Sequence, residues 1–461
     1  MSELSYSFDN DDDDWTPSPS AAVDTAKEVA PKVVTTDLLT RGSVLQVASR
    51  LVETFSGSRI ETAPVRLEGG ADPDEDHPVA QMVKTVLAEA KRVRASDVHF
   101  MCRSNDMLIR FRIDGALTDA LAIPLDMGAG VISRIKIMSN LNIVERRRPQ
   151  DGQFSQIIDG AELDVRVSTV ASVNGENCVL RILDKSRAAL SLGQLGMPDH
   201  TYAKFAKLIH SPFGMVICAG PTGSGKTTTL YAAVGELVDP TVNIMTIEDP
   251  VENVFPGIVQ LQTNDQAGFD FATGLRAILR QDPDILLVGE IRGQDTTRVA
   301  IQAAMTGHFV ASSVHATDAV SALYRLLDME IEAFLVASSV IGVVGQRLLR
   351  RICDNCRVTY ELSDEEKDFH RVSEGPDLEE FWKGAGCDEC SGTGFRGRIG
   401  VYELLVMTPE IRRAVIGWAS QEEIRALAVK QGMRTMVHEA FSLVETGVTT
   451  VAEVLRSVYT S

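Results

Sequence analysis

A glycine-rich loop between an apolar strand and a helix constrains this chain more than any other feature. Residues 214–219 (GMVICA) have the composition of a buried strand, and residues 220–227 (GPTGSGKT) match the pattern GxxxxGK[ST]. The glycines allow backbone N–H groups to curl around phosphate oxygens, and the following helix contributes its positive end. Because strand, loop and helix agree, a chance glycine turn is disfavoured. The pattern predicts a phosphate-binding loop formed by Gly220, Pro221, Thr222, Gly223, Ser224, Gly225, Lys226, Thr227 and Thr228.

Two residues of this loop indicate the ligand more closely. Lys226 would neutralise the β- and γ-phosphates of a nucleoside triphosphate, and the Thr227 hydroxyl would bind Mg²⁺. We therefore expect ATP with Mg²⁺ at the loop. Binding is not hydrolysis, because hydrolysis also needs a carboxylate near the metal and the attacking water.

Acidic residues that follow apolar strands are the candidates for that carboxylate. Glu290 ends the run DILLVGE, and the run TIEDPVE carries Glu248, Asp249 and Glu252. Carboxylates at strand ends beside a phosphate loop suit Mg²⁺ coordination and water activation, whereas a solvated or helix-capping acidic turn is the alternative. In the run TGHFVASSVHATDA, His315 is a candidate sensor of the γ-phosphate, and His308 is considered beside it.

Strand and helix patterns divide the chain into six segments. From residue 191 to 352, apolar strands alternate with helices, which is typical of a parallel sheet with helices on both faces. Over residues 78–190, a helix followed by alternating strand-like runs predicts an α+β domain. The remaining segments are an acidic tail expected to be disordered (1–36), a short helical stretch with a linker (37–77), a cysteine-containing subdomain (353–400) and a C-terminal helical subdomain (401–461).

Four of the seven cysteines form two CxxC pairs. Two thiolates on one tight turn can reach the same ion, and two such turns complete a tetrahedral zinc site. Sulfur would fill all four positions, so the expected role of the zinc is structural. Two disulfides are the alternative. The predicted ligands are Cys353, Cys356, Cys387 and Cys390.

The charge balance and the absence of a long apolar run argue against several classes of protein. The chain has 45 Lys and Arg against 64 Asp and Glu, a net charge of −19, so nucleic-acid phosphates should be repelled overall. No apolar run reaches about 18 residues, and the acidic first residues do not match a secretory signal. These patterns predict a cytoplasmic protein that meets a membrane only through a partner.

Several motifs, in order and spacing, resemble one known family. The runs GPTGSGKTTTLYA, TIEDPVE, GLRAILRQDPDILLVGEIR and TGHFVASSVHATDA resemble the type II secretion and type IV pilus assembly ATPases. The resemblance continues through ASDVHF, RFRIDG and DVRVSTV upstream and RIGVYELLVMTPEIR downstream. It implies an α/β fold: a RecA-like P-loop motor domain with a mostly parallel sheet. A PAS-like α+β N-terminal domain would precede the motor domain, and a zinc-knuckle insertion and a helical C-terminal segment would follow it.

The resemblance also implies residue roles. The phosphate loop would be the Walker A loop, Glu248, Asp249 and Glu252 the Asp box, Glu290 the end of the Walker B strand, and His315 part of the His box. Arginines would close over ATP in a hexameric ring, because the transition state spreads negative charge over the phosphoryl oxygens. The candidates are Arg110, Arg112, Arg134, Arg147 and Arg166, with Arg276 and Arg280 in the motor domain.

The implied function is a homo-hexameric motor that drives assembly of a type IV pilus or a secretion pseudopilus. It would act at the cytoplasmic face of the inner membrane, with a polytopic platform protein as partner and pilin or pseudopilin as indirect partners. The cysteine pairs favour an assembly motor, because retraction motors of the family lack them. A DNA-uptake or nucleic-acid translocating motor, and a ring scaffold that does not hydrolyse ATP, are the alternatives.

Two short runs depart from the usual pattern, and a third carries a separate resemblance. Gly293 stands where an acidic residue is common, and the His box reads SSVHATD. Both changes keep Glu290 and His315, so they bear on rate or coupling rather than on activity. The stretch LLTRGSVLQVASRLVE resembles the cyclic-di-GMP-binding repeat of some family members.

Overall fold

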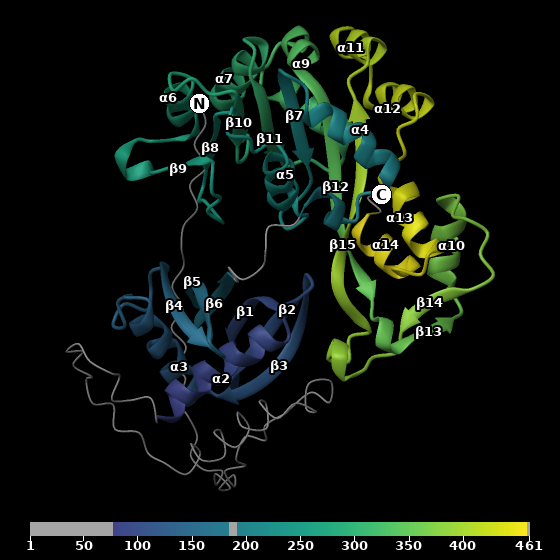
Figure 1. Ribbon diagram of the computed structural model, residues 1–461. Helices are drawn as coiled ribbons and strands as arrows, with labels where there is room; N and C mark the ends of the chain where they lie inside the picture. Colours follow the sequence, from purple (N-terminus) through teal and green to yellow (C-terminus); the bar gives the residue numbers. More distant parts are fainter. Residues whose placement is uncertain (1–76, 184–190, 459–461) are drawn as a thin grey trace, which may run out of the picture.

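The computed structural model describes residues 77–183 and 191–458 (Figure 1). The predictions for residues 1–36, for the stretch and linker before residue 77, and for cyclic-di-GMP binding lie outside these ranges. Among the described residues, no helix combines the length and the apolar character needed to cross a membrane.

Residues 77–183 form a six-stranded antiparallel sheet with two helices on one face, called here the amino-terminal domain. The strand order is β3-β2-β1-β6-β5-β4. Val98 and Phe100 of β1 point into the helix-covered core, so Asp97 and His99 between them face the opposite side of the sheet. The elements are α2 (Pro78–Arg92), β1 (Ala95–Cys102), β2 (Asp106–Ile113), β3 (Ala116–Pro124), α3 (Leu125–Met138), β4 (Gln150–Ile158), β5 (Ala161–Ser172) and β6 (Gly175–Leu183).

A seven-stranded sheet, called here the motor sheet, forms the second domain in the order β15-β12-β7-β11-β10-β8-β9. All neighbouring strands are parallel except β12 and β15, which are antiparallel. The interior strand β10 (ILLV) is buried at every position, as expected for a parallel strand covered on both faces. The strands are β7 (Gly214–Ala219), β8 (Ile244–Glu248), β9 (Val259–Gln262), β10 (Ile285–Val288), β11 (Phe309–Val314), β12 (Val340–Ile352) and β15 (Phe395–Val406).

Helices cover both faces of the motor sheet and create one core on each side. One core is closed by α4 and α5, and the other by α6 to α9 together with α11 and α12 from the C-terminal part of the chain. The predicted α/β architecture is confirmed. These helices are α4 (Asp199–Ile209), α5 (Lys226–Gly235), α6 (Phe271–Ile278), α7 (Gln294–Met305), α8 (Ala319–Asp328), α9 (Ala333–Ser339), α11 (Pro409–Ile416) and α12 (Gln421–Lys430).

The boundary expected at residue 400 is wrong, because it falls inside β15. Residues 401–406 belong to a strand that pairs with β12 and is largely buried, so they extend the motor sheet instead of opening a helical subdomain. The far ends of β12 and β15 carry a fourth core, formed with α10, α13 and α14 (Figure 1). The remaining elements are η1 (Leu192–Leu195), η2 (Asp265–Ala267), η3 (Asp354–Cys356), β13 (Arg357–Tyr360), α10 (Asp364–Val372), β14 (Phe381–Gly384), η4 (Asp388–Cys390), α13 (Met436–Glu445) and α14 (Val451–Ser457).

A polar contact joins the amino-terminal domain to the start of β15. Asp114, in the turn between β2 and β3, accepts the backbone N–H of Gly397 at 2.7 Å. Its carboxylate also lies 3.7 Å from Arg398. In Figure 1 the amino-terminal domain lies below the motor sheet, with β5 and β6 on its upper side.

Candidate nucleotide-binding site

The phosphate loop lies at the carboxyl edge of the motor sheet, between β7 and α5. Gly223 and Gly225 have φ values of 77° and 89°, in the left-handed region that favours glycine. A side chain on Gly220 would meet the carbonyl oxygen of Gln346 at 2.6 Å, and one on Gly225 would meet its amide nitrogen at 2.9 Å. Gly220 is therefore closely packed between Ser224 of the loop and the backbone of β12, whereas Gly225 is favoured mainly by its positive φ.

Lys226 folds back onto its own loop. Its Nζ donates to the carbonyl oxygens of Gly220 (2.9 Å) and Pro221 (3.0 Å). Burial lowers the pKa of Lys226, and the carboxylate of Glu290 opposes this effect. Two neutral carbonyls compensate an ammonium less well than an anion does, so the arrangement favours a phosphate. Of the other predicted loop residues, Thr227 is half-buried, Ser224 is buried, and Pro221, Thr222, Gly223 and Thr228 are exposed.

Glu290 lies just beyond β10, beside the loop. Its Oε2 is 3.3 Å from Nε2 of His315, which follows β11, and its Oε1 forms an ion pair with Arg292. The Glu290 side chain is only 16% exposed, whereas the His315 side chain is 49% exposed. The structure thus brings together three residues that are spread over 89 positions of the sequence, Lys226, Glu290 and His315, as parallel strands with a common carboxyl edge require.

The first carboxylate of the acidic box (Glu248, Asp249 and Glu252) accepts hydrogen bonds on both of its oxygens. Glu248, the last residue of β8, is 3% exposed. Its Oε1 accepts from Thr246 Oγ1 (2.6 Å) and Gln260 Nε2 (3.1 Å), and its Oε2 accepts from the hydroxyl of Tyr231. Burial and Glu248 together raise the pKa of Tyr231, so this hydroxyl stays a donor. These bonds fix the chain where Asp249, which is exposed, leaves the strand.

Besides the contact of Asp114 with Arg398, the two domains also interact electrostatically at Glu252. Its backbone N–H lies 3.4 Å from the Tyr231 hydroxyl oxygen. Desolvation by the surrounding protein, and to a smaller extent the charge of Glu248, raise the pKa of the Glu252 carboxyl. The positive charges of Arg166 and Arg181 oppose this rise. Arg166 and Arg181 are direct cross-strand partners on β5 and β6. The sequence singled out Arg166 but missed Arg181, although Arg181 sits at an alternating position of a strand-like run.

Two further predicted arginines share the same sheet but are held by acids. Arg110 Nε donates to Asp119 Oδ1 at 2.7 Å, and Arg112 Nε lies 3.6 Å from Asp97. Asp97 also bonds Arg181 at 3.1 Å. The cross-strand row of Arg166, Arg181, Asp97 and Arg112 therefore carries more positive than negative charge.

The other predicted arginines lie on different elements. Arg134 is on α3, and Arg147 is exposed in the loop between α3 and β4. Arg276, on α6, and Arg280, just after it, are exposed, and Arg280 Nη1 donates to the backbone carbonyl of Arg276 at 2.8 Å. Among the described residues, no ion pair ties Arg276 or Arg280 to the phosphate loop.

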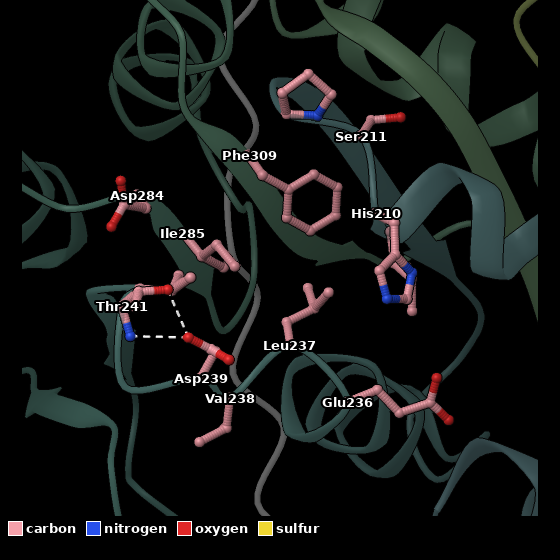
Figure 2. A pocket seen from close by; sticks show the side chains of 13 residues that line it. His210, Ser211, Glu236, Leu237, Val238, Asp239, Thr241, Asp284, Ile285 and Phe309 are labelled. Carbon is pink, nitrogen blue, oxygen red and sulfur yellow. Dashed lines mark hydrogen bonds between the residues drawn. The ribbon is translucent and has the colours of Figure 1, made fainter.

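The opposite, amino edge of the motor sheet holds His308 and a separate hollow. His308 precedes β11, and its Nδ1 bonds the carbonyl oxygen of Ala303 at 2.9 Å, so it does not share the edge of His315. The hollow has a volume of about 430 Å³ and is floored by Ile285 and Phe309, with Leu237 and Asp239 at its rim (Figure 2). Figure 2 shows no residue of the phosphate loop among its lining side chains, so the hollow is not the nucleotide site.

The four predicted zinc ligands meet at one point. Sulfur–sulfur distances are 3.8 Å for Cys353–Cys387, 3.8 Å for Cys356–Cys390 and 3.7 Å for Cys387–Cys390. A tetrahedral ion with bonds of about 2.3 Å holds its sulfurs about 3.8 Å apart, whereas a disulfide needs about 2.05 Å. The spacing therefore fits a metal ion, and all four thiols are free of disulfides.

Backbone N–H groups support the sulfurs. Gly386 donates to Cys356 Sγ (3.3 Å), and Gly394 donates to Cys390 Sγ (3.2 Å). Asn355 donates to Cys387 Sγ at 3.3 Å and is the main reason that the pKa of Cys387 falls to about 6. Such donors stabilise thiolates, the form of cysteine that binds a metal.

Comparisons with known proteins agree with this geometry. The family model described as "Type II/IV secretion system protein" matches residues 72–456. The chain is 45% identical to the type II secretion system protein HxcR of Pseudomonas aeruginosa over 84% of this chain and 78% of that protein. It is 39% identical to the type IV pilus assembly ATPase PilB of Thermus thermophilus over 93% of this chain and 48% of that protein. The solved structure of the ATPase DotB of Legionella pneumophila has a similar fold, with a TM-score of 0.60 at 20% identity, covering 80% of this chain and 93% of that one.

Proposed function

This chain belongs to the type II/IV secretion system protein family and is an ATP-hydrolysing motor of a secretion or pilus assembly system, and we propose that it works as a ring of six copies. The ring would stand at the cytoplasmic face of the inner membrane and bind a polytopic platform protein there. Pilin or pseudopilin subunits would be moved through that partner. The observation that carries the proposal is the position of Glu290 between Lys226 and His315 beside the phosphate loop.

We propose the following division of labour at the loop. When ATP binds with Mg²⁺, Lys226 exchanges the carbonyls of Gly220 and Pro221 for phosphate oxygens. The Thr227 hydroxyl, in the first turn of α5, ligates the metal. Glu290 accepts a proton from the attacking water, and His315 contacts the γ-phosphate and reports its loss.

The acidic box and the amino-terminal domain would close the site. Glu248 holds the box in place, whereas Asp249 and Glu252 are free to face the metal and its waters. Arg166 and Arg181 already act on Glu252 electrostatically, which supports a closing movement that carries both guanidinium groups onto the phosphates. Arg110 and Arg112 lie further along the same sheet and extend this positive surface.

Arginines on exposed elements would serve a neighbouring copy. Arg276 and Arg280 lie at the solvent-facing end of α6, and Arg147 lies in an exposed loop of the amino-terminal domain. Among the described residues, no ion pair ties these side chains to the phosphate loop of their own copy, so they could complete the site of the next subunit. Arg134, on α3, would act through the loop that follows this helix.

We propose that the four-cysteine group binds Zn²⁺ and has a structural role. The metal would join η3 and η4 and so fix the C-terminal end of β12 and the N-terminal end of β15. All four ligands are sulfur, so a bound zinc would keep no open position for chemistry.

One set of measurements tests the ring and its chemistry. One copy has a mass of 50.1 kDa, so light scattering with ATP and Mg²⁺ should report six times that value. Glu290→Gln should keep ATP bound and release no phosphate, while the unmodified protein turns ATP over. In the host, this variant should abolish the filament or the secreted product.

Three outcomes would redirect the proposal. Normal hydrolysis by Glu290→Gln would move the role of general base to Glu252 or Glu248. A monomeric mass in every nucleotide state would refute the ring. Strong stimulation of turnover by DNA would favour a nucleic-acid translocating motor instead.

A further inference from the structure

Arg347, on β12, is a buried cation that the roles above do not use. Its side chain is 8% exposed, and among the described residues its Nη1 has no hydrogen-bond partner. Burial lowers the pKa of Arg347, and the carboxylate of Asp318 opposes this effect. Burying a guanidinium nitrogen without a hydrogen bond is costly, so Nη1 favours an anion that can accept from it.

The place of Arg347 in the sheet brings it beside the phosphate loop. β12 pairs with β7 up to Gly345 and Ala219, so residues 346 and 347 run alongside the loop that follows β7. Side chains alternate along a strand, and Gln346 points to α5, where Thr229 Oγ1 donates to its Oε1 at 2.9 Å. Arg347 therefore points to the other face, with Gly345, where the start of α8 packs.

The positive charge of Arg347 interacts electrostatically with Lys226 of the phosphate loop. It is one of the groups that lower the pKa of Lys226, so the two cations repel each other. Two neighbouring cations that lack an anion between them are a common arrangement at phosphate sites, because the ligand brings the missing negative charge.

Asp318 cannot supply that anion by itself. Its Oδ1 accepts the backbone N–H of Ser321 at 2.8 Å, which caps α8, and its Oδ2 accepts from Arg425 Nη2 at 2.9 Å. Both carboxylate oxygens are thus engaged, and no hydrogen bond joins Asp318 to Arg347 among the described residues.

We propose that Arg347 is a further phosphate-binding residue of the ATP site, acting from the same copy of the chain as Lys226. The proposal rests on nucleotide binding at the phosphate loop. Bound nucleotide would place phosphate oxygens near the guanidinium, relieve its repulsion with Lys226 and give Nη1 a partner. Arg347 would then also link the nucleotide to Asp318 and, through Arg425, to helix α12.

The test compares two arginines of the same strand. Arg347→Met keeps the length of the side chain and removes its charge, and Arg347→Lys restores a charge without the fork. The control is Arg350→Met, because Arg350 is already held by Glu453 at 2.7 Å. Each full-length protein is titrated calorimetrically with the non-hydrolysable analogue AMP-PNP and Mg²⁺, and its melting temperature is measured without nucleotide.

The two positions are expected to affect different quantities: Arg347 the affinity for AMP-PNP, and Arg350 the melting temperature without nucleotide. Arg347→Met should weaken AMP-PNP binding at least tenfold, which corresponds to about 1.4 kcal/mol, and should leave the nucleotide-free melting temperature unchanged or raise it. Arg347→Lys should recover part of the affinity. Arg350→Met should lower the melting temperature and bind the analogue like the unmodified protein.

Two results would overturn the proposal. The first is binding within twofold of the unmodified protein by Arg347→Met. The second is a drop in its melting temperature equal to that of Arg350→Met, which would mark Arg347 as a structural residue. Lys226→Ala tests the nucleotide site independently of Arg347. If Lys226→Ala still binds AMP-PNP like the unmodified protein, nucleotide does not bind at the phosphate loop, and the proposed function fails as well.

Discussion

Replacing Tyr231 with phenylalanine removes one oxygen atom and tests how the acidic box is built. The hydroxyl donates to Oε2 of Glu248 and accepts the backbone N–H of Glu252. Without it, Glu248 keeps Thr246 and Gln260 on Oε1, but Oε2 stays buried with no donor. A hydrogen bond to a charged acceptor contributes about 1.5–3 kcal/mol, so we expect Tyr231→Phe to lower the free energy of unfolding by about 2 kcal/mol.

A matched control shows how much stability is lost when a tyrosine hydroxyl that donates to an uncharged acceptor is removed. Tyr402 is buried in the same domain, and its hydroxyl donates to the neutral carbonyl of Leu195 at 3.2 Å. Tyr402→Phe should cost about 1 kcal/mol, the usual value for a neutral hydrogen bond. Urea unfolding followed by fluorescence measures both variants under one set of conditions.

The same substitution should also slow catalysis. In the unmodified protein, the Tyr231 hydroxyl holds the backbone N–H of Glu252. Without this hydrogen bond, the Glu252 carboxylate is less firmly positioned. A loss of about 1.4 kcal/mol in transition-state stabilisation lowers kcat tenfold, and phosphate release at saturating ATP measures it. Equal unfolding costs for Tyr231→Phe and Tyr402→Phe, together with an unchanged kcat for both, would refute the reasoning.

Three further predictions test other parts of the structure. Arg166→Ala should lower kcat about 100-fold in a phosphate-release assay, because one donor to the developing charge is lost, whereas Arg103→Ala in the same domain should leave kcat unchanged. Cys390→Ser should lower bound zinc from one ion per chain, measured by atomic absorption, and should lower the melting temperature. Gly384→Ala should cost about 1–3 kcal/mol in urea unfolding, because its new methyl group meets backbone of the facing strand segment, and Gly193→Ala, with open space around it, should not.

Much of the fold could be predicted because its signals are local. The phosphate loop needs glycine at specific places, and GxxxxGK[ST] shows those places directly. The buried run before Gly220 and the run before Glu290 are continuous apolar strands, which is the pattern of a parallel sheet. The two CxxC pairs likewise carry their spacing in the sequence.

Strand β15 was misplaced for a physical reason. Its buried half, residues 400–405, is short and mostly apolar, with Glu403 inside it, and such a run is equally compatible with the start of a helix. Its strand character comes from pairing with β12, more than 40 residues earlier, and no local pattern records that partner.

The sequence by itself determined the chemistry that this protein can perform: a loop that binds phosphates, carboxylates at strand ends and four thiolates with metal-binding spacing. Only the tertiary structure decided which charges share a site. It joined Lys226 to Glu290 and His315 at one sheet edge, and it set Arg166 and Arg181 against Glu252. It also buried Arg347 on the strand next to the loop, where Nη1 finds no hydrogen-bond partner among the residues that the structure describes. Residue type and spacing are written in the chain, whereas distance, burial and the resulting electrostatic coupling exist only after distant strands have paired.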